Sequence, residues 1–409
     1  MNYLADKNKE MKIGIIKEGK KPADNRVALT PAQCKWIIKN YPNVKILVQN
    51  SESRCFSDAE YHQAGIELTN DLSDCEIILG IKEIPIDMLL PGKTYLFFSH
   101  TKKKQPYNQK LMHAMMDKKI TLIDYECLEH EDGQRIVGFG FFAGVVGAHN
   151  GLMAFGKRTG EFDLGRVFQQ KDYRHLIHQY FGIKLPKIKI AVTGSGRVAK
   201  GIVEIMNMMD IQEVEPDDYL SKSFSYPVFV HLKSALLYAH KINGGYKRDD
   251  FHNNPSNYQC LFSKYISSTD ILMNGIYWEK NIPSLFQAED LRTPHFNIQT
   301  IADITDDLHG SVPCNLGDST IEEPVYGVDK FSMEKTAPYL PTSVDMMAVG
   351  NLPNELPRDA SRFFGNQLIK YVFEELYKGK SAMIDNATIL NNGELTTPYQ
   401  YLSDFATHG

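Results

Sequence analysis

The chain has 409 residues, more than one hydrophobic core usually supports, so the sequence predicts about two domains. Hydrophobic residues make up 43% of it and its formal net charge is only −5, which excludes a disordered protein and gives no reason to expect nucleic acid as a partner. The cysteines are scattered without paired spacing, so we expect reduced thiols and no metal site.

Two segments bear on the location of the chain. Residues 1–11 are polar and charged, without the apolar core of a signal peptide, so the sequence predicts a cytoplasmic protein. Residues 137–156 are apolar enough to raise the question of a membrane span, but they contain several glycines together with His149 and Asn150. We therefore expect this segment to be buried, to be helical in its second half and to link two domains, rather than to contact a membrane.

The first third of the chain alternates short apolar strands with segments compatible with helices. Thr30 followed by Pro31 is typical of a helix start, because threonine caps free amides and proline fits the first turn. Alternation of this kind predicts an α/β domain with a parallel sheet. The expected strands are residues 12–16, 44–48, 76–80, 94–98 and 121–124.

Polar side chains follow these predicted strands at the points where the strands end. Lys82 and Glu83 come after the third strand. His100 comes after the fourth strand and Glu126 after the fifth. Parallel α/β sheets bind ligands outside the carboxyl ends of their strands, so we expect these side chains to supply an acid and a base of different pKa. Arg26, just before the first helix, is placed to grip a carboxylate with two hydrogen bonds.

A second informative stretch is residues 187–201, in which an apolar strand enters a glycine turn and leaves as a helix. Gly194 permits the tight turn, Gly196 lets the backbone approach phosphate oxygens, and Ala199 allows close packing of helix and strand. The first amides of the helix favour an anion. The alternative is a strand, turn and helix with only a structural role. We predict a dinucleotide site bordered by Gly194, Ser195, Gly196, Arg197 and Val198.

The adenosine ribose is expected at the tip of the next strand in the sequence. Residues 212–216 follow the helix at about the spacing of twenty residues that dinucleotide sites use. A carboxylate at Glu215 would hydrogen-bond the ribose hydroxyls of NAD and repel the extra phosphate of NADP, so NAD is favoured without excluding NADP. The alternative is a solvated acidic turn.

The last part of the chain completes the expected domain organisation. Residues 360–376 carry apolar side chains at helical spacing and are expected to return to the first domain. The sequence therefore predicts an α/β protein with two Rossmann-like domains, parallel sheets and a cleft between them. The substrate domain would comprise residues 1–145 and about 340–409, and the dinucleotide domain residues 146–339 with an insertion near 221–264.

Eleven stretches carry a resemblance to known enzymes over nearly the whole chain. They resemble the lysine-forming saccharopine dehydrogenases and the related lysine–ketoglutarate reductase domains, and more distantly alanine dehydrogenase. Arg26, Lys82 and His100 are shared with alanine dehydrogenases, whereas residues 274–279 and 352–364 look like the saccharopine branch alone. The stretches are residues 25–31, 80–85, 97–101, 122–126 with 135–140, 143–147, 193–201, 214–216, 274–279, 302–305 and 352–360.

The resemblance implies a role for each candidate residue. Lys82 and His100 would be the acid–base pair, and Glu83 and Glu126 would tune them. The residues implied to bind substrate carboxylates are Arg26 and Arg135, and Asp303 is implied on the cofactor side with Gly194 and Gly196.

The implied activity is the interconversion of saccharopine with lysine and 2-oxoglutarate by hydride transfer with NAD or NADP. Glu83 is similar to the fungal NAD enzymes, whereas residues 214–216 and 221–264 are similar to NADP-linked reductase domains, so the cofactor stays open. The alternatives are another amino-acid dehydrogenase of the alanine type and a non-catalytic nucleotide-binding protein. The expected partners are small-molecule substrates, and the sequence leaves a homo-oligomer open.

Overall fold

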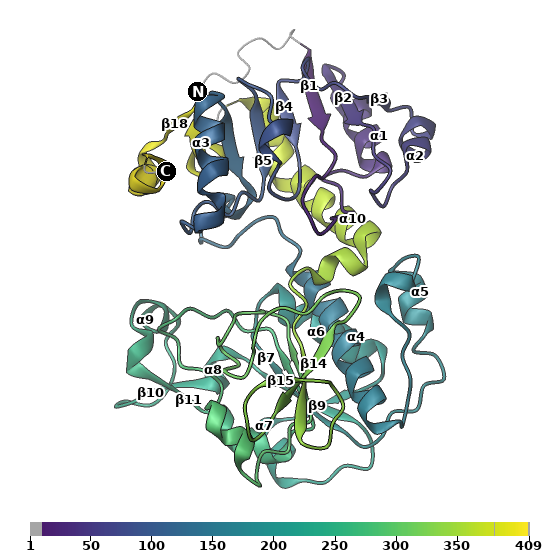
Figure 1. The fold of residues 1–409 in the computed structure, drawn as a ribbon, viewed down its shortest axis with the longest axis vertical. Helices are drawn as coiled ribbons and strands as arrows, with labels where there is room; N and C mark the ends of the chain where they lie inside the picture. The colour runs from purple at the N-terminus through teal and green to yellow at the C-terminus, as the bar shows by residue number, and fades with distance from the viewer. Residues whose placement is uncertain (1–9, 380, 408–409) are drawn as a thin grey trace. The chain divides into compact units, whose positions relative to one another are not determined.

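The structure is a computed structural model that describes residues 10–379 and 381–407 (Figure 1). It divides into two compact units. Unit 1 contains the residues up to Phe139 together with those from Pro357 onward, and unit 2 contains Gly140–Leu356. Residues 1–9, which hold most of the polar segment expected to lack an export signal, lie outside the described residues.

Unit 1 is built on one eight-stranded sheet with the order β18-β17-β6-β5-β4-β1-β2-β3. The six strands from β6 to β3 are parallel, and β17 and β18 add an antiparallel edge. The strands are β1 (Met11–Ile15), β2 (Val44–Gln49), β3 (Glu67–Thr69), β4 (Ile77–Leu79), β5 (Thr94–Phe97), β6 (Thr121–Asp124), β17 (Thr388–Asn391) and β18 (Glu394–Leu395). The α-helices are α1 (Pro31–Asn40), α2 (Asp58–Gln63), α3 (Gln109–Asp117), α10 (Pro357–Gln367), α11 (Glu374–Lys378), α12 (Ala382–Ala387) and α13 (Ser403–Thr407).

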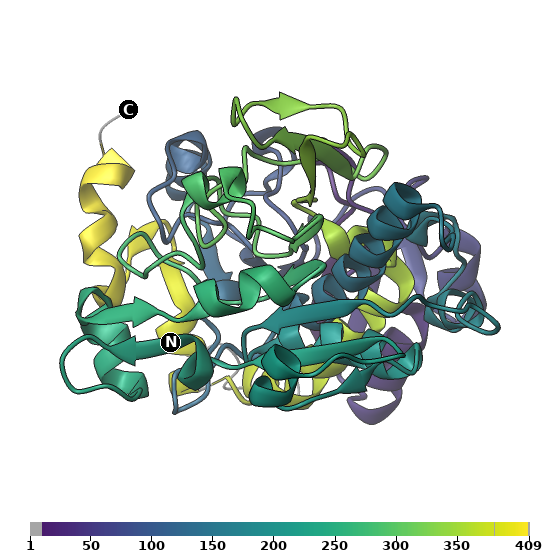
Figure 2. The ribbon, with the colours of Figure 1, turned by 90° about the horizontal axis from the view of Figure 1, so that it is seen from below.

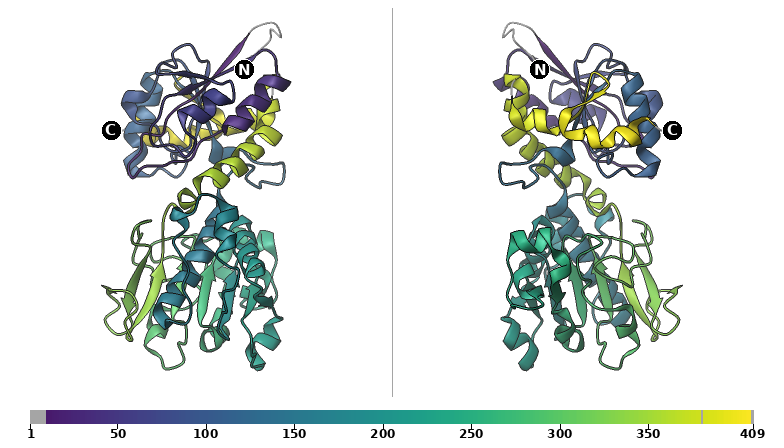
Figure 3. Two further views of the ribbon diagram at one scale, coloured as in Figure 1. Left: turned by 90° about the vertical axis from the view of Figure 1, so that its right-hand side faces the viewer. Right: turned by 90° about the vertical axis from the view of Figure 1, so that its left-hand side faces the viewer.

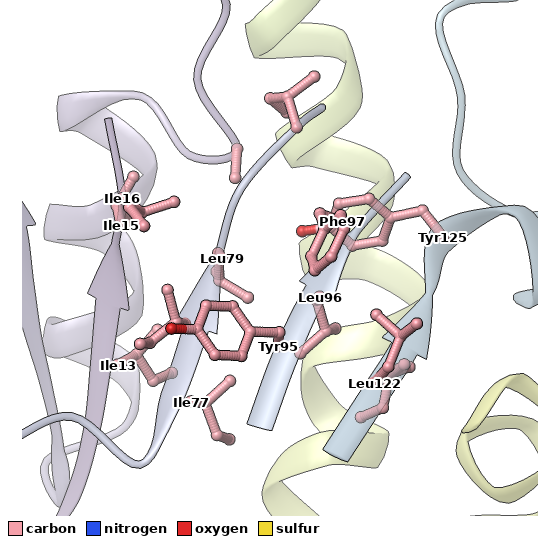
Figure 4. Close-up of a cluster of buried hydrophobic side chains, with 14 of the residues drawn as sticks. Ile13, Ile15, Ile16, Ile77, Leu79, Tyr95, Leu96, Phe97, Leu122 and Tyr125 are labelled. Carbon is pink, nitrogen blue, oxygen red and sulfur yellow. The ribbon is translucent and has the colours of Figure 1, made fainter. Parts of the chain in front are cut away.

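The central strands of unit 1 are apolar on both faces because helices cover both. Every residue of β4, β5 and β6 is buried. Figure 4 shows Leu79, Leu96 and Leu122 from these three neighbouring strands in one cluster with Ile13 of β1. Burying each such side chain contributes about 1.5–3 kcal/mol, so this cluster holds the strand ends in a fixed register.

Helix α1 begins as the sequence predicts. The Thr30 side chain accepts a hydrogen bond from the amide of Gln33, and the Gln33 side chain accepts one from the amide of Thr30. This reciprocal pair satisfies two of the amides that a helix start leaves without partners. The cap also fixes the path of the chain just after Arg26, one of the predicted site residues.

The C-terminal part of unit 1 returns through α10, a π-helical segment at Leu368–Phe373 and α11. Figure 3 shows these yellow-green elements beside the N-terminal elements of the same unit. The helix expected at residues 360–376 is therefore present. The return begins at Pro357 rather than near residue 340, because β16 (Ser343–Met347) is still a strand of the unit 2 sheet.

Unit 2 holds a second eight-stranded sheet with the order β15-β14-β16-β13-β12-β7-β9-β8. Strands β16 to β8 are parallel, and β14 and β15 are antiparallel. Two largely parallel sheets with helices confirm the expected pair of Rossmann-like domains. The strands are β7 (Lys189–Thr193), β8 (Gln212–Glu213), β9 (Val228–Leu232), β12 (Ile271–Asn274), β13 (Thr300–Asp303), β14 (Val325–Asp329), β15 (Lys335–Thr336) and β16. The α-helices are α4 (Gly140–Thr159), α5 (Tyr173–His178), α6 (Arg197–Met208), α7 (Pro216–Ser221), α8 (Ser234–Leu237) and α9 (Arg248–Asn253).

Helix α4 accounts for the apolar, glycine-rich segment. It is helical from Gly140, so the helix covers more of the segment than the second half that we expected. A Cβ added at Gly144 would lie 2.0 Å from the carbonyl oxygen of Val198, and one at Gly201 would lie 2.0 Å from that of Phe141. The glycines therefore let α4 and α6 pack backbone to backbone. Within the described ranges, no helix is both long and apolar enough to span a membrane.

The segment near residues 221–264 adds a small antiparallel pair, β10 (Tyr238–His240) and β11 (Tyr258–Cys260), outside the main sheet (Figure 2). Tyr238, Phe251 and Tyr258 are buried between the pair and α9, and their rings are in contact. This aromatic cluster holds the added segment together.

Candidate active site

The order of the unit 1 sheet brings the predicted polar residues to one edge. Strands β6, β5, β4 and β1 are consecutive neighbours and all parallel, so their carboxyl ends lie on the same edge. Lys82 and Glu83 follow β4, His100 follows β5, and Glu126 follows β6. Because these strands are adjacent in the sheet, the residues that follow them lie at the same edge.

Glu83 and His100 form a close pair at this edge. The Nδ1 atom of His100 lies 2.7 Å from Oε1 of Glu83, and the Lys20 ammonium donates to Oε2 at 2.7 Å. Burial raises the pKa of Glu83, but the hydrogen bond and charge of His100 and the hydrogen bond of Lys20 outweigh it and hold the pKa near 2. An ionised Glu83 fixes Nδ1 of His100 as the protonated nitrogen, so Nε2 is the atom that exchanges a proton.

The backbone of His100 is held in an unusual conformation. Its φ is 52°, in the left-handed region that costs a non-glycine residue about 1 kcal/mol or more. The hydroxyl of Ser99 accepts from the amide of Thr101 at 3.3 Å and lies 2.8 Å from the Thr101 hydroxyl. This turn forces the histidine side chain away from the strand direction and presents it to Glu83.

Asp124 anchors that turn and was not among the residues singled out from the sequence. Its carboxylate accepts hydrogen bonds from the amide and hydroxyl of Ser99, and from the amide of Glu126 at 2.7 Å. Burial raises the pKa of Asp124 to about 6, against the opposing effect of the Ser99 hydrogen bond. One buried carboxyl thus ties the residue before His100 to Glu126. The only sequence signal was its position as the last residue of a buried strand.

Glu126 contacts Arg135, a pairing that the sequence did not predict. Nη2 of Arg135 donates to Oε1 of Glu126 at 3.1 Å, and Arg135 is 42% exposed. The guanidinium therefore still faces solvent, where a dissolved carboxylate has access to it.

Lys82 is half-buried in a strongly charged environment. Burial and the nearby charge of Arg26 lower its pKa to about 8, against the opposing effect of Asp24. Its backbone amide donates to Oε2 of Glu18 at 2.9 Å, while the amide of Ile81 donates to Oε1 at 2.7 Å. Burial and the charge of Asp24 raise the pKa of Glu18 to about 8. The end of β1 therefore fixes the backbone that carries Lys82.

Arg26 is buried, and its guanidinium is held by Asp24. Nε and Nη2 donate to the two carboxylate oxygens of Asp24 at 2.9 and 2.5 Å. The guanidinium also stacks over the ring of Phe139, at 4.1 Å from its centroid. Burial raises the pKa of Asp24, but the charge and hydrogen bonds of Arg26 overcome it and leave a pKa of about 2. Arg26 thus has an internal carboxylate partner that the sequence did not indicate.

In unit 2 the glycine turn fits the phosphates of a dinucleotide. Gly194 has a φ of 104°, and a Cβ added there would lie 2.4 Å from the carbonyl oxygen of Gly275. Gly196 caps the twelve-residue helix α6, and a Cβ added there would meet no atom within 4 Å. Ser195 and Gly196 are exposed. The first amides of α6 therefore face open space, as an anion at a helix N-terminus requires.

Asp303 lies below this turn in a fully buried polar network. Its carboxylate accepts from Nδ2 of Asn274 and Nδ2 of Asn315, both at 2.8 Å. Asn274 in turn accepts from the hydroxyl of Thr193 at 2.7 Å. Burial raises the pKa of Asp303. The network ties together the carboxyl ends of β7, β12 and β13, so Asp303 supports the turn from within the fold.

Glu215 lies further from the turn than its place in the sequence suggests. It is exposed and precedes α7 at the end of β8. The spatial neighbour of β7 on this side is β9, and β8 pairs with β9 alone. The order of these strands in the sheet, β7-β9-β8, differs from their order in the chain. A single sequence does not show this difference.

Comparison with solved structures defines the class of the protein. The chain matches a structure titled L-alanine dehydrogenase with a TM-score of 0.66 and 16% identity, over 97% of this chain and 100% of that one. A transhydrogenase from Sinorhizobium meliloti matches with a TM-score of 0.56. Residues 14–146 match the family model for the alanine dehydrogenase/PNT N-terminal domain. The fold is that of the alanine dehydrogenases.

Curated proteins of known activity are similar to the chain over most of its length. The chain is 31% identical to the mitochondrial alpha-aminoadipic semialdehyde synthase of Rattus norvegicus over 93% of its own length. It spans about half of that relative, 46% of its length. The NAD(+), L-lysine-forming saccharopine dehydrogenase of Emericella nidulans is 25% identical over 92% of this chain and 96% of its own length. The chain is thus similar to saccharopine dehydrogenases and semialdehyde synthases, and it has the fold of an alanine dehydrogenase.

Proposed function

We propose that this chain is an oxidoreductase that interconverts saccharopine with lysine and 2-oxoglutarate, using a nicotinamide cofactor. The carrying observation is the cluster at the carboxyl edge of the unit 1 sheet. It combines a lysine whose pKa is lowered to about 8 with a histidine whose tautomer is fixed by Glu83. A lysine base with a lowered pKa and a histidine with a defined proton-exchanging atom are groups that imine formation and reduction need.

The reaction asks each group to move a proton at a defined atom. Addition of the substrate's ε-amine to the keto carbon requires the amine to lose its proton, and the neutral form of Lys82 takes it. The carbinolamine then loses water to form an iminium, and Nε2 of His100 donates the proton that its oxygen needs. In this relay the proton taken by Lys82 passes on to His100, so Lys82 is neutral again when the cationic iminium forms and does not repel it. The reduced nicotinamide, when bound, supplies the hydride that converts the iminium carbon to that of a secondary amine.

Two arginines at this edge suit a substrate with several carboxylates. Arg135 is partly exposed beside Glu126, and Arg26 lies beside Lys82 with Asp24 as its internal partner. A guanidinium binds a carboxylate with two parallel hydrogen bonds. We propose that Arg135 binds one carboxylate at the surface and that Arg26 holds the oxoacid next to Lys82.

The cofactor would be bound by unit 2. The open space above Gly196 and the amides at the start of α6 fit a pyrophosphate, and Ser195, Arg197 and Val198 border it. Asp303 would act from below the turn through Asn274. NAD and NADP both fit this part of the site, since their pyrophosphates are identical.

An assay of substrate pairs tests the proposal. The loss of nicotinamide absorbance would be followed with lysine plus 2-oxoglutarate, and separately with ammonia plus pyruvate, for both reduced cofactors. We expect turnover with the first pair only. Turnover with ammonia and pyruvate alone would instead assign an alanine dehydrogenase activity, which the fold similarity makes the natural competitor. Binding of a nucleotide without turnover of either pair would overturn the enzymatic proposal.

We also propose a cytoplasmic location and small molecules as the sole substrates. All six cysteines lie in the described part of the chain and are free thiols, which suits a reducing compartment. The animal relatives are named mitochondrial, so imaging of the tagged protein in cells with a mitochondrial marker decides between the two compartments.

A further inference from the structure

The strand beside the glycine turn is β9, and its carboxyl end touches the turn directly. Thr193, the last residue of β7, is in register with Leu232, the last residue of β9. The amide of Gly194 donates to the carbonyl oxygen of Leu232 at 3.1 Å, and Nε2 of His231 donates to the carbonyl oxygen of Gly194 at 2.8 Å. Two hydrogen bonds therefore lock the end of β9 against the turn.

That position decides which ribose a dinucleotide site accepts. In this class of fold, the end of the strand beside the glycine turn carries the residue that reads the adenosine ribose. A carboxylate there selects NAD through the two ribose hydroxyls, and a cation there accommodates the extra phosphate of NADP. Neighbouring strands are about 4.8 Å apart, so Glu215 at the end of β8 stands one strand too far out.

The residue that follows Leu232 is Lys233. It is exposed, and no described residue forms a hydrogen bond or ion pair with its ammonium group. The side chain is thus available to a ligand at the glycine turn.

The charge of the surrounding segment supports the same assignment. Residues 228–248 include Lys233, Lys241, Lys247 and Arg248 and contain neither aspartate nor glutamate. Burial raises the pKa of Tyr246, while a hydrogen bond from Ser234 and the charge of Arg248 lower it, so Arg248 lies near the residue after Lys233. Asp249 and Asp250 follow only in α9, so no carboxylate stands at the end of β9 itself, and Lys233 occupies the position where a carboxylate would select NAD.

We infer that Lys233 binds the 2′-phosphate of NADP and that the end of β9 makes this site selective for NADP. The inference rests on the proposed function to the extent that a dinucleotide must bind at the glycine turn. It gives the added segment near residues 221–264 a role, because that segment supplies β9, Lys233 and Arg248. It also replaces Glu215 as the residue that sets cofactor choice.

The test compares cofactor affinities by titrating the fluorescence of NADPH and NADH against the intact chain. Lys233→Gln should weaken NADPH binding by about 10- to 100-fold, the range for loss of a hydrogen bond to a charged group, and change NADH binding less than about twofold. Arg248→Gln should have a smaller effect in the same direction. The control is Lys187→Gln, an exposed lysine just before β7 and therefore at the opposite edge of the same sheet.

The outcomes separate this inference from the proposed function. Wild-type protein that binds NADPH and NADH equally, or a Lys233→Gln variant that keeps its NADPH preference, overturns the role of Lys233 while leaving the dinucleotide site in place. A change of cofactor ratio in Glu215→Gln, with none in Lys233→Gln, assigns the ribose to Glu215 instead. Absence of binding of both cofactors to the wild-type chain would overturn the dinucleotide site itself, and the inference with it.

Discussion

Nδ1 of His100 lies 2.7 Å from Oε1 of Glu83, and the same carboxylate accepts a hydrogen bond from Lys20. The two partners of Glu83 have different consequences. The lysine contributes charge, whereas the histidine gains a fixed tautomer and therefore a defined proton-exchanging atom at Nε2. Glu83 therefore contributes both to the stability of this edge of the sheet and to the proton transfer proposed for His100.

Replacing Glu83 by glutamine should change the dependence of stability on pH. The folded-state pKa of Glu83 is lowered from 4.5 to about 2, so its contribution is present above pH 4.5 and is lost as the pH falls toward 2. The shift corresponds to at most about 3 kcal/mol. Urea unfolding monitored at several pH values should therefore show Glu83→Gln less stable than wild type at pH 7, with the difference shrinking in acid. A difference that stays constant from pH 7 to pH 3 would show that the charge of Glu83 is not what stabilises the fold.

The two glycines of the unit 2 turn should respond differently to a methyl group. A Cβ at Gly196 meets no protein atom within 4 Å, so Gly196→Ala should fold normally and lose nucleotide affinity because the methyl occupies the approach of the pyrophosphate. A Cβ at Gly194 would lie 2.4 Å from the carbonyl oxygen of Gly275, at a φ of 104°, so Gly194→Ala should lower the melting temperature as well. Calorimetry and nucleotide titration on both variants separate the effects. Equal melting temperatures for the two variants would contradict this reading of the turn.

The framework of the site could be predicted because it follows from periodic patterns. The strands ending before Lys82, His100 and Glu126 are short apolar runs bounded by turns, and parallel strands put their ends on one edge. The capped start of α1 follows from Thr30, Pro31 and their spacing. These features depend on local residues, which a single sequence displays.

The partners of the site residues could not be predicted in the same way. Asp24 holds Arg26 from two residues away through a turn whose path the sequence leaves open, and Asp124 reaches Ser99 across twenty-five positions. The insertion of β9 between β7 and β8 depends on the fold of residues 221–264, whose strands are short and separated by polar turns. Long-range pairing and strand order come from tertiary packing, so they appear only in the structure.

Removing the acceptor capacity of Asp124 should impair His100 without removing any group that moves a proton. In Asp124→Asn, an NH2 group that cannot accept a hydrogen bond replaces one carboxylate oxygen, so either Ser99 or Glu126 loses its acceptor and the turn that holds His100 at a φ of 52° loses an anchor. We expect turnover to fall by about tenfold to a hundredfold, as for a small misplacement of a catalytic group, with cofactor affinity unchanged.

The NMR chemical shifts of the His100 ring nitrogens distinguish this positioning role from general loss of stability. These shifts report the tautomer of the ring, so they should change in Asp124→Asn and in Ser99→Ala, because both release the ring from Glu83. Asp74→Asn is the matched control, since Asp74 is an exposed carboxylate at the opposite edge of the same sheet. Unchanged ring-nitrogen shifts in a variant with reduced turnover would assign Asp124 a purely structural role.

The mechanism depends most on Lys82 and His100 acting as one proton relay. Lys82→Met and His100→Gln should each lower turnover by about 10² to 10⁴, the usual range for a general acid or base, while nucleotide binding stays nearly unchanged. The pKa of Lys82 is lowered to about 8, and its neutral form is the base, so turnover in the direction of saccharopine formation should rise with pH up to about 8. That limb of the pH profile should disappear in Lys82→Met. Because both groups serve the same proton transfers, the double variant should be less impaired than the product of the single losses. Fully multiplicative losses, or a Lys82→Met protein that retains wild-type turnover and its pH profile, would transfer the acid–base role to another group at this edge, with Glu18 the next to test.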